Sequence, residues 1–297
     1  MLSMSTEKKE KDFLNSYNIT KYEKPSIATD IAIFSILEEV EENYRKLPQK
    51  KLNLLLIRRG GYPYKDMWAL PGGFLEPTET VEEAAARELK EETNVSEAHL
   101  EQMHVFSDLG RDPRGWILST SFIALIDGQK ADVKSSDDAA EATWFQVSFK
   151  LAKAEKEYNE DKIIVKSLYK LYLKHQDMEL MAEIEERKEI SNYHEQISYQ
   201  ILKSEGLAFD HGKIIAFALQ YLRQHIENAH MAFDLLPEYF TLTDLQQVYE
   251  IILDKELLVA NFRRKIADRV IETNKNQEGA GHRPSKLYKR NLEVDNL

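Results

Sequence analysis

The chain of 297 residues contains no cysteine. Disulfides, thiolate metal sites and cysteine nucleophiles are therefore excluded. Long apolar runs are missing as well: the longest, around residues 31–37 and 52–57, fall far below the ~18–20 residues that span a bilayer. The N-terminus opens with a Lys/Glu run and lacks the apolar core of a secretory signal. We therefore expect a cytoplasmic protein without a membrane partner.

Positive charge is in overall deficit. Lysine and arginine number 40 against 51 aspartates and glutamates, and the net charge of −11 argues against a protein that coats nucleic acid with its whole surface. A local basic patch is compatible with this balance. At ~100–200 residues per domain, the length indicates about two domains. The composition, 42% hydrophobic and 31% charged, is typical of a folded protein.

Glycine and proline are absent from residues 129–205. A stretch of 77 residues without either type favours helix, because both residues interrupt helices. The spacing of Ile164, Leu168 and Leu171 fits one helix face. We therefore expect two amphipathic helices over about 155–205, packed on the sheet domain or on a partner chain.

Before that stretch, apolar and β-branched segments predict strands around one internal helix. Strands are expected over residues 30–38, 51–58, 116–126 and 142–147. Thr80 followed by Glu83 is a capping-box signature, which predicts a helix over about 80–93. Several strands with a single internal helix indicate the α+β class.

Three glutamates of the expected helix share a face with its apolar stripe. At 100° per residue, Glu88, Glu91 and Glu92 lie within an arc of about 100°, beside Val81 and Leu89. Like charges at these spacings repel by a few tenths of a kcal/mol per pair. A divalent cation would remove this penalty, and carboxylates without histidine or cysteine suit Mg²⁺ or Mn²⁺. The alternative is a charge-rich helix whose acids all face water.

Residues next to this helix are also consistent with a ligand site. Glu79 lies just before the helix and Arg87 on its flank, so an ion pair between them would tie the incoming loop to the helix. Gly72 and Gly73 allow the backbone to turn tightly and to approach a ligand closely.

The segment resembles the Nudix box, G-x5-E-x7-R-E-U-x-E-E-x-G-U with U aliphatic. Eight positions match: Gly73, Glu79, Arg87, Glu88, Leu89, Glu91, Glu92 and Val95. The second glycine is replaced by Asn94. Asparagine is the next-best residue for the left-handed conformation after a helix end, so we expect the fold to tolerate it.

The resemblance implies an α/β/α sandwich that hydrolyses a nucleoside diphosphate linked to another group. It implies that Glu88, Glu91 and Glu92 hold Mg²⁺ or Mn²⁺, as catalytic metal ligands, and that Glu79 and Arg87 form a structural pair. Metal ions would neutralise the diphosphate and activate a water for attack on phosphorus. The general base stays open between a box glutamate and an acid on another loop.

The flanking loops are similar to the ADP-ribose-type branch of this family. In that branch the loop at 110–116 lies near the substrate, so Arg111 or Arg114 would bind phosphate with two parallel hydrogen bonds. Arg58, at a strand end, is a further phosphate candidate. The alternative for each arginine is a surface ion pair. Glu76 is a candidate for an extra metal ligand.

The C-terminal third predicts a helix-turn-helix followed by a hairpin. A helical pattern at about 214–226 is expected to close the first domain. A capped helix at 240–253, a basic helix at 261–267 and a hairpin of 270–274 with 286–290 follow. The hairpin turn would contain Gly279, Gly281 and Pro284. Helix, turn, basic helix and hairpin together make a winged helix-turn-helix.

Charge is distributed unevenly in a way that fits this prediction. Residues 260–292 carry nine lysines and arginines against three acids, a net charge of +6, so the other 264 residues carry −17. Such asymmetry indicates a DNA-facing patch. The expected DNA-binding residues are Arg263, Arg264 and Lys265 on the helix and Arg283 and Lys286 on the wing. The alternative is a small packing domain with a basic tail.

Four C-terminal segments are similar to the Nudix-related transcriptional regulators of NAD metabolism, the NrtR type. They are Leu207–His211, Leu236–Leu242, Asn261–Lys265 and Gly281–Tyr288. The resemblance implies that the Nudix domain senses ADP-ribose or a related metabolite and that the winged helix binds operator DNA as a homodimer. His211 would border the ligand pocket or act as a capping or packing residue.

These interpretations give three regions. We expect a polar arm at 1–25, a Nudix domain at 26–228 with a helical insertion at about 148–205, and a winged helix at 229–297. The preferred function is a Mg²⁺-dependent hydrolase of ADP-ribose or a related nucleotide, fused to a DNA-binding domain. The alternative is a non-catalytic, ADP-ribose-sensing repressor.

Overall fold

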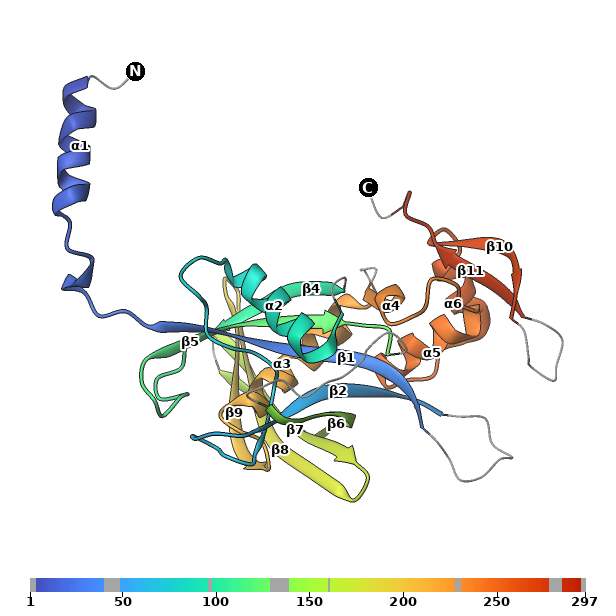
Figure 1. Ribbon diagram of the computed structural model, residues 1–297. Helices are drawn as coiled ribbons and strands as arrows, with labels where there is room; N and C mark the ends of the chain where they lie inside the picture. Colours follow the sequence, from blue (N-terminus) through green and yellow to red (C-terminus); the bar gives the residue numbers. More distant parts are fainter. Residues whose placement is uncertain are drawn as a thin grey trace.

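The computed structural model describes residues 4–39, 49–95, 98–128, 139–159, 161–227, 231–277 and 285–294. Within these ranges the chain forms a nine-stranded sheet flanked by helices and a C-terminal lobe with a two-stranded hairpin (Figure 1). The strand order is β4-β5-β1-β2-β6-β7-β8-β9, and the short β3 pairs with β2.

The first half of the sheet confirms three of the expected strands. It consists of β1 (Ser26–Glu39), β2 (Gln49–Arg59), β3 (Trp68–Ala69), β4 (His99–Phe106) and β5 (Ile117–Leu125). β1 runs parallel to β5 and antiparallel to β2. β4, which pairs antiparallel with β5, is an edge strand that we did not predict.

The central strand β1 is buried on both faces. Ile33 packs with Leu89 of α2 (Val81–Thr93). Its neighbour Phe34 packs on the other face, with α3 (His211–His225). Successive side chains of a strand point to opposite faces, so this apolar run requires a covering layer on each side. The result is the expected α/β/α sandwich.

Both ends of α2 follow the expectation from its sequence. The Glu83 amide donates to the Thr80 hydroxyl at 3.2 Å, and the Thr80 amide donates to the Glu83 carboxylate at 2.8 Å. Asn94 ends the helix with a φ of 56° and donates its amide to the Lys90 carbonyl at 2.8 Å. Asparagine therefore takes the left-handed position that the Nudix box gives to glycine.

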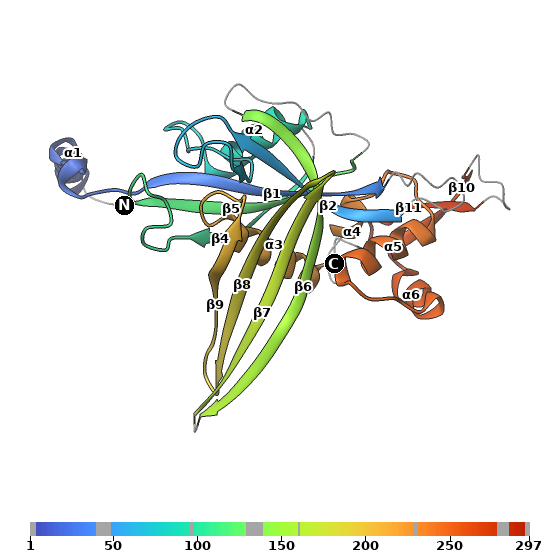
Figure 2. The same cartoon turned by 90° about the horizontal axis from the view of Figure 1, so that it is seen from below.

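The expected helices over about 155–205, and hence a helical insertion at 148–205, are wrong. This region forms four long antiparallel strands that extend the sheet (Figure 2). They are β6 (Ala139–Asn159), β7 (Lys162–His175), β8 (Met178–Ser191) and β9 (Glu195–Glu205). The strand expected at 142–147 is the start of β6.

Buried side chains alternate with more exposed ones along these strands, a period of two residues. The spacing that fits a helix concealed this alternation. Leu171 and Leu173 of β7 are buried, and so are Ala182 and Ile184 of β8, with every second side chain facing the core. The turn between β7 and β8 uses Gln176 in a left-handed conformation, with a φ of 51°. Polar residues such as Gln, Asn and Asp thus replace glycine and proline in these turns.

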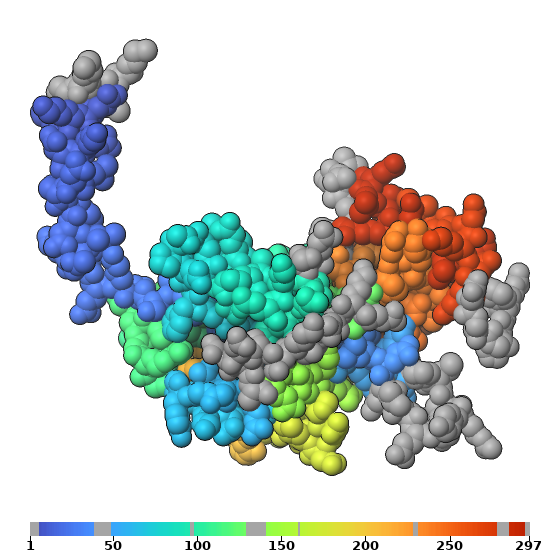
Figure 3. Space-filling view, viewed as in Figure 1, coloured from blue at the N-terminus to red at the C-terminus, as the bar shows by residue number. Residues whose placement is uncertain are grey.

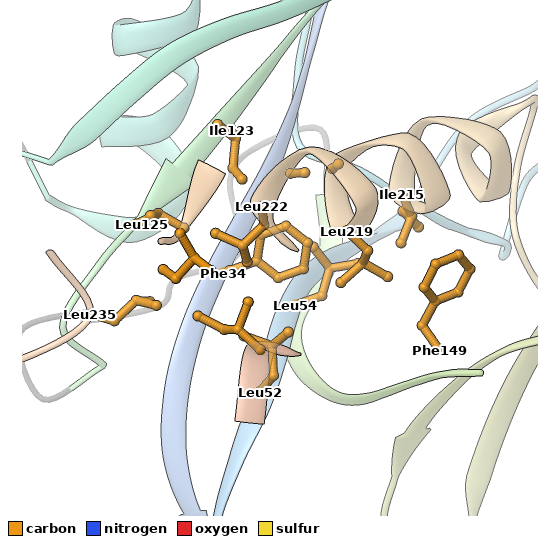
Figure 4. Close-up of a cluster of buried hydrophobic side chains, with 14 of the residues drawn as sticks. Phe34, Leu52, Leu54, Ile123, Leu125, Phe149, Ile215, Leu219, Leu222 and Leu235 are labelled. Carbon is orange, nitrogen blue, oxygen red and sulfur yellow. The ribbon is translucent and has the colours of Figure 1, made fainter. Parts of the chain in front are cut away.

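The helix α3 lies in the centre of the larger core. Leu219 and Leu222 are buried, and Figure 4 shows them against Phe34, Leu52 and Leu54 of β1 and β2. Strands β8 and β9 contact the same helix, so the sheet curves around it. Each such leucine contributes roughly 1.5–3 kcal/mol through removal from water.

The C-terminal lobe has the order of elements expected of a winged helix. It contains α4 (Met231–Asp234), α5 (Leu242–Leu253), α6 (Val259–Ile266), β10 (Val270–Asn276) and β11 (Lys286–Arg290). Leu245 and Phe262 belong to the same buried cluster as Leu222 of α3. The expected turn residues Gly279, Gly281 and Pro284 lie outside the described residues.

The N-terminal arm contains α1 (Met4–Ser16) and a 3₁₀ turn at Ile19–Lys21. Figure 3 shows this arm standing clear of the body, at the opposite end from the winged lobe. None of the helices in the described part of the chain combines the length and apolarity needed to cross a membrane.

Candidate functional site

A pocket of about 850 Å³ opens beside α2 at the end of the sheet where α3 begins. Its walls come from β1, the end of β2, the glycine turn before α2, α2 itself, the loop after β4 and the start of α3. This volume lies in the range of pockets that hold a nucleotide-sized ligand.

The glycine turn is packed too tightly for any side chain. Gly72 has a φ of 153°, and a Cβ atom there would lie 2.0 Å from the Thr29 carbonyl oxygen. A Cβ atom on Gly73 would lie 2.1 Å from a carboxylate oxygen of Glu88. Both glycines line the pocket, so their small size brings backbone and the Glu88 carboxylate together.

The three box glutamates line the same pocket, with different degrees of exposure. Glu92 is buried, Glu88 is partly buried, and the Glu91 side chain is half exposed. Burial raises the pKa of Glu88, although its hydrogen bond with Arg87 opposes the shift. The arc predicted from helix geometry is therefore the wall that faces the pocket.

Arg87 ties the loop before α2 to the helix. Its guanidinium donates to both oxygens of Glu79, at 2.9 and 3.2 Å. A third bond, at 2.7 Å, goes to Glu88, and Glu91 lies 3.7 Å away. The hydrogen bond to Arg87 lowers the pKa of Glu79 and, in turn, raises the pKa of Arg87.

The chemistry of this acidic wall suits a hard divalent cation. Glu88, Glu91 and Glu92 offer only carboxylate oxygens, which Mg²⁺ and Mn²⁺ prefer. Within the described ranges, no three acid, histidine or cysteine side chains already converge on one metal position. Glu76 is exposed and is not part of the pocket wall; its amide donates to Glu79.

Arg111 lies in the pocket wall with only 5% of its side chain exposed. Its guanidinium donates to Asp210 at 2.7 and 3.0 Å and lies 3.5 Å from Asp30. Burial alone would lower the pKa of Arg111, but the two carboxylates outweigh burial and raise it. Two carboxylates, Asp30 and Asp210, therefore hold this arginine in the pocket wall.

Arg114 is partly exposed and lies near two aromatic rings. Asp112 holds its guanidinium with bonds of 3.0 and 2.7 Å. The guanidinium carbon lies 5.0 Å from the Phe74 ring centre and 5.4 Å from that of Phe209. This arrangement places a phosphate-binding group beside two aromatic rings.

Arg58, expected at the substrate, is not part of the pocket wall. It pairs with Asp66 at 3.2 Å, and its neighbour Arg59 lines the pocket instead. A shift of one residue along a strand changes the face to which a side chain points. Arg59 lies 4.8 Å from the Phe209 ring centre, and burial lowers its pKa.

Two pocket residues, Asp30 and Phe209, were missed by sequence reasoning. Asp30 interrupts an apolar strand and accepts a hydrogen bond from the Ser119 hydroxyl. Phe209 adopts a φ of 51°, which is rare for a bulky residue and is found mostly at functional sites. A charge inside an apolar run was the available signal for Asp30, whereas Phe209 lies in the segment Leu207–His211 that resembles the NrtR type, without a feature of its own that marks it.

His211 lines the pocket and is fully buried. Its Nδ1 atom accepts a hydrogen bond from the Leu70 amide at 2.8 Å, so the ring proton lies on Nε2, 3.5 Å from Asp30. Burial lowers the pKa of His211. Neutral His211 therefore presents a single donor toward the pocket and Asp30.

The C-terminal lobe presents basic side chains on the outer face of α6. Phe262 and Ile266 are buried beneath the helix, and Phe262 packs edge-on against Tyr249 of α5 at 5.3 Å. The exposed residues are Arg263, Arg264 and Lys265. Lys265 pairs with Glu227 at 2.9 Å.

The wing adds Lys286, which pairs with Glu272 at 2.9 Å. Arg283, the other predicted wing residue, lies outside the described residues. The amphipathic pattern of α6 thus fixes its inner face and leaves its basic face outward.

Comparison with known proteins finds a family model for each part of the chain. Residues 46–167 match the NUDIX domain model, and residues 232–289 match the NrtR DNA-binding winged helix domain model. A crystal structure of a MutT/nudix family protein from Enterococcus faecalis superposes with a TM-score of 0.65 and 26% identity, covering 98% of this chain and 100% of that chain. The fold and the pocket thus define a Nudix protein with a C-terminal winged helix.

Two relatives indicate which group of Nudix proteins this chain belongs to. The chain is 30% identical over 283 residues to the ADPR responsive transcriptional repressor NtrR of Acinetobacter baylyi, which covers 94% of this chain and 88% of the relative. It is 44% identical over 100 residues to the ADP-ribose pyrophosphatase of Methanocaldococcus jannaschii, covering 34% of this chain and 58% of that protein. The chain belongs to the NrtR family of Nudix-related regulators.

Proposed function

We propose that this protein is a DNA-binding regulator that responds to ADP-ribose or a closely related nucleotide. The observation that carries the proposal is the combination, in one chain, of a pocket lined by acids and arginines with an exposed basic helix in a winged lobe. Support also comes from the Acinetobacter baylyi relative, which matches along both parts of the chain.

In this proposal the pocket recognises each part of the nucleotide differently. Arg114, Arg59 and Arg111, which all line the pocket, bind the diphosphate, because guanidinium forks match phosphate oxygens. Phe74, which is 44% exposed, offers a ring face for a base, since stacking contributes about 1–3 kcal/mol per base. Glu88, Glu91 and Glu92 would hold Mg²⁺ or Mn²⁺ against the diphosphate.

The winged helix would bind operator DNA through phosphate and groove contacts. Arg263, Arg264 and Lys265 of α6 reach the duplex, and Lys286 with Arg283 contacts the backbone from the wing. We propose a homodimer in the cytoplasm, because two half-sites double the contact with DNA. Sedimentation equilibrium should then give twice the mass of one chain, and a single-chain mass would contradict the dimer.

A binding assay with and without nucleotide tests the regulator. The probe is labelled DNA from upstream of NAD-biosynthesis genes, titrated by fluorescence anisotropy at low and high salt. We expect salt-sensitive binding whose affinity changes when ADP-ribose is added. Absence of binding at low salt, or an affinity that ADP-ribose leaves unchanged, would remove the regulator proposal.

A second candidate function is hydrolysis of the ADP-ribose diphosphate to AMP and ribose 5-phosphate. It is favoured by the complete set Glu88, Glu91 and Glu92 on the wall of the same pocket, since sensing alone does not require all three. A bound divalent cation would neutralise the diphosphate and lower the pKa of a water. The protein itself orients Glu88 through Arg87 and holds the diphosphate with Arg114.

Chromatographic detection of AMP from ADP-ribose, with Mg²⁺ and then with excess EDTA, tests this second function. AMP formation that requires the metal is the expected result. If the wild-type protein releases no AMP from any nucleoside diphosphate derivative, the hydrolase proposal fails while the regulator proposal is unaffected.

A further inference from the structure

The helix α3 connects the nucleotide pocket directly to the winged lobe. Its first residue, His211, lines the pocket, and Arg223 near its other end contacts α5. At 1.5 Å per residue the helix spans about 20 Å. Leu219 and Leu222 pack the middle of the helix against the core.

At the pocket end, α3 is held by groups that a nucleotide would contact. Asp210, which precedes the helix, receives two hydrogen bonds from Arg111. His211 accepts a bond from the Leu70 backbone and faces Asp30. Asp210 makes no side-chain cap on its own helix, so Arg111 is what fixes its carboxylate.

At the far end, Arg223 bridges the two domains. Its guanidinium donates to the Ile252 carbonyl in α5 at 3.1 Å and to the Phe149 carbonyl in β6 at 2.9 Å. The Ile252 carbonyl lies in the last turn of α5, where carbonyl groups lack partners within the helix. Arg223 therefore secures the C-terminal end of α5 to the sheet domain.

Two lysines of the sheet domain hold α5 at the same time. Lys50 of β2 pairs with Asp244 in the first turn of α5, and Lys150 of β6 pairs with Asp254 just after its last turn. Since α5 packs against the basic helix α6, the position of α5 sets the orientation of the DNA-facing surface.

We propose that α3 transmits occupancy of the nucleotide pocket to the winged helix through Arg111–Asp210 at one end and Arg223–Ile252 at the other. The inference rests on the proposed nucleotide binding. A diphosphate in the pocket competes with Asp210 and Asp30 for the Arg111 guanidinium, because all three are anions. Release of Asp210 shifts α3 in its core, and Arg223 carries that shift to α5. Sites coupled in this way influence each other reciprocally.

The absence of cysteine makes the test direct, because labels attach only at introduced positions. We would label Glu82→Cys on α2 and Lys289→Cys on β11, both exposed, and measure the distance distribution by pulsed electron paramagnetic resonance. The ligand is ADP-ribose with a methylene bridge between its phosphorus atoms, which cannot be cleaved, with Mg²⁺. Calorimetry measures its affinity in parallel.

In the wild-type background we expect the ligand to shift the distance distribution. Arg223→Gln should abolish the shift while leaving the ligand affinity within about twofold, since Arg223 does not line the pocket. Arg187→Gln, on β8 and paired with Glu189, is the matched control and should keep the shift. If Arg223→Gln does not fold, Asp210→Asn interrupts the same coupling at the pocket end of α3.

The outcomes separate the inference from the proposed function. If the ligand does not bind the wild-type protein, the proposed function fails. If it binds but leaves the distance unchanged, or if both Arg223→Gln and Asp210→Asn keep the full shift, coupling through α3 is overturned.

Discussion

The pocket and the outer face of α6 use the same charged residue types in opposite ways. In the pocket, Arg111 is 5% exposed and is held by the buried Asp30 and the partly buried Asp210. On α6, Lys265 is 49% exposed and has one surface partner, Glu227. Buried, matched charges fix a geometry, whereas exposed charges create a field that acts over distance. The first arrangement suits recognition of one small ligand, and the second suits a long polyanion.

This contrast leads to different responses to salt. Exposed charges are screened over about 8 Å at physiological ionic strength, while buried pairs are screened much less.

Removing the buried cation should have the largest effect on stability. Arg111→Met leaves Asp30 and Asp210 without their shared partner, and we expect a loss of about 3–5 kcal/mol in the free energy of unfolding. Urea denaturation measures it. Arg263→Met on α6 is the matched control and should stay within about 0.5 kcal/mol of wild type. Similar losses of unfolding free energy in both variants would contradict the proposed difference between the pocket and α6.

The acidic wall of the pocket provides the next test. Glu91→Gln keeps the size of the side chain but removes a metal-binding charge. If the protein is a hydrolase, we expect AMP release to fall about 100-fold or more, equivalent to roughly 3 kcal/mol. Glu82→Gln, at an exposed acid in the first turn of α2, should leave the rate unchanged. Equal rates in the two variants would show that the wall is not catalytic.

A substitution on the outer face of α6 should change DNA binding alone. For Arg264→Ala we expect about tenfold weaker binding and a salt-dependence slope smaller by about one. Lys156→Ala, exposed on β6, serves as the control. An unchanged salt slope in Arg264→Ala would mean that another surface meets the DNA.

The smallest effect concerns pH. Burial lowers the pKa of His211 below its ordinary value near 6.5, so the folded protein keeps this ring neutral while the unfolded chain takes up a proton. The stabilisation is complete only well above pH 6.5 and declines as the pH falls, by about 0.7 kcal/mol between pH 7 and 6 for one such group. Thermal unfolding across this range should show the decline. His211→Asn should flatten it, and an identical slope in that variant would contradict the assignment.

The two amphipathic patterns of the chain were not equally informative. In α2 the capping box and the box glutamates agree with one another, so the helix and its acidic face followed from neighbouring residues. In β7 the spacing of Ile164, Leu168 and Leu171 also fits a helix, yet these residues form a strand. Pairing with β6 and β8 supplies hydrogen bonds along the whole segment, and such distant partners leave no trace in local spacing.

Local signals are enough to predict the capped helix α2, its acidic face and the basic helix of the winged lobe. The distant residues that complete the pocket could be identified only in the folded chain. It placed Asp30, Arg59 and Phe209 beside the box glutamates, and it directed Arg111 toward buried acids. The physical reason is that helix caps and side-chain periodicity act over a few residues, whereas the walls of a pocket meet through packing of segments far apart in the chain.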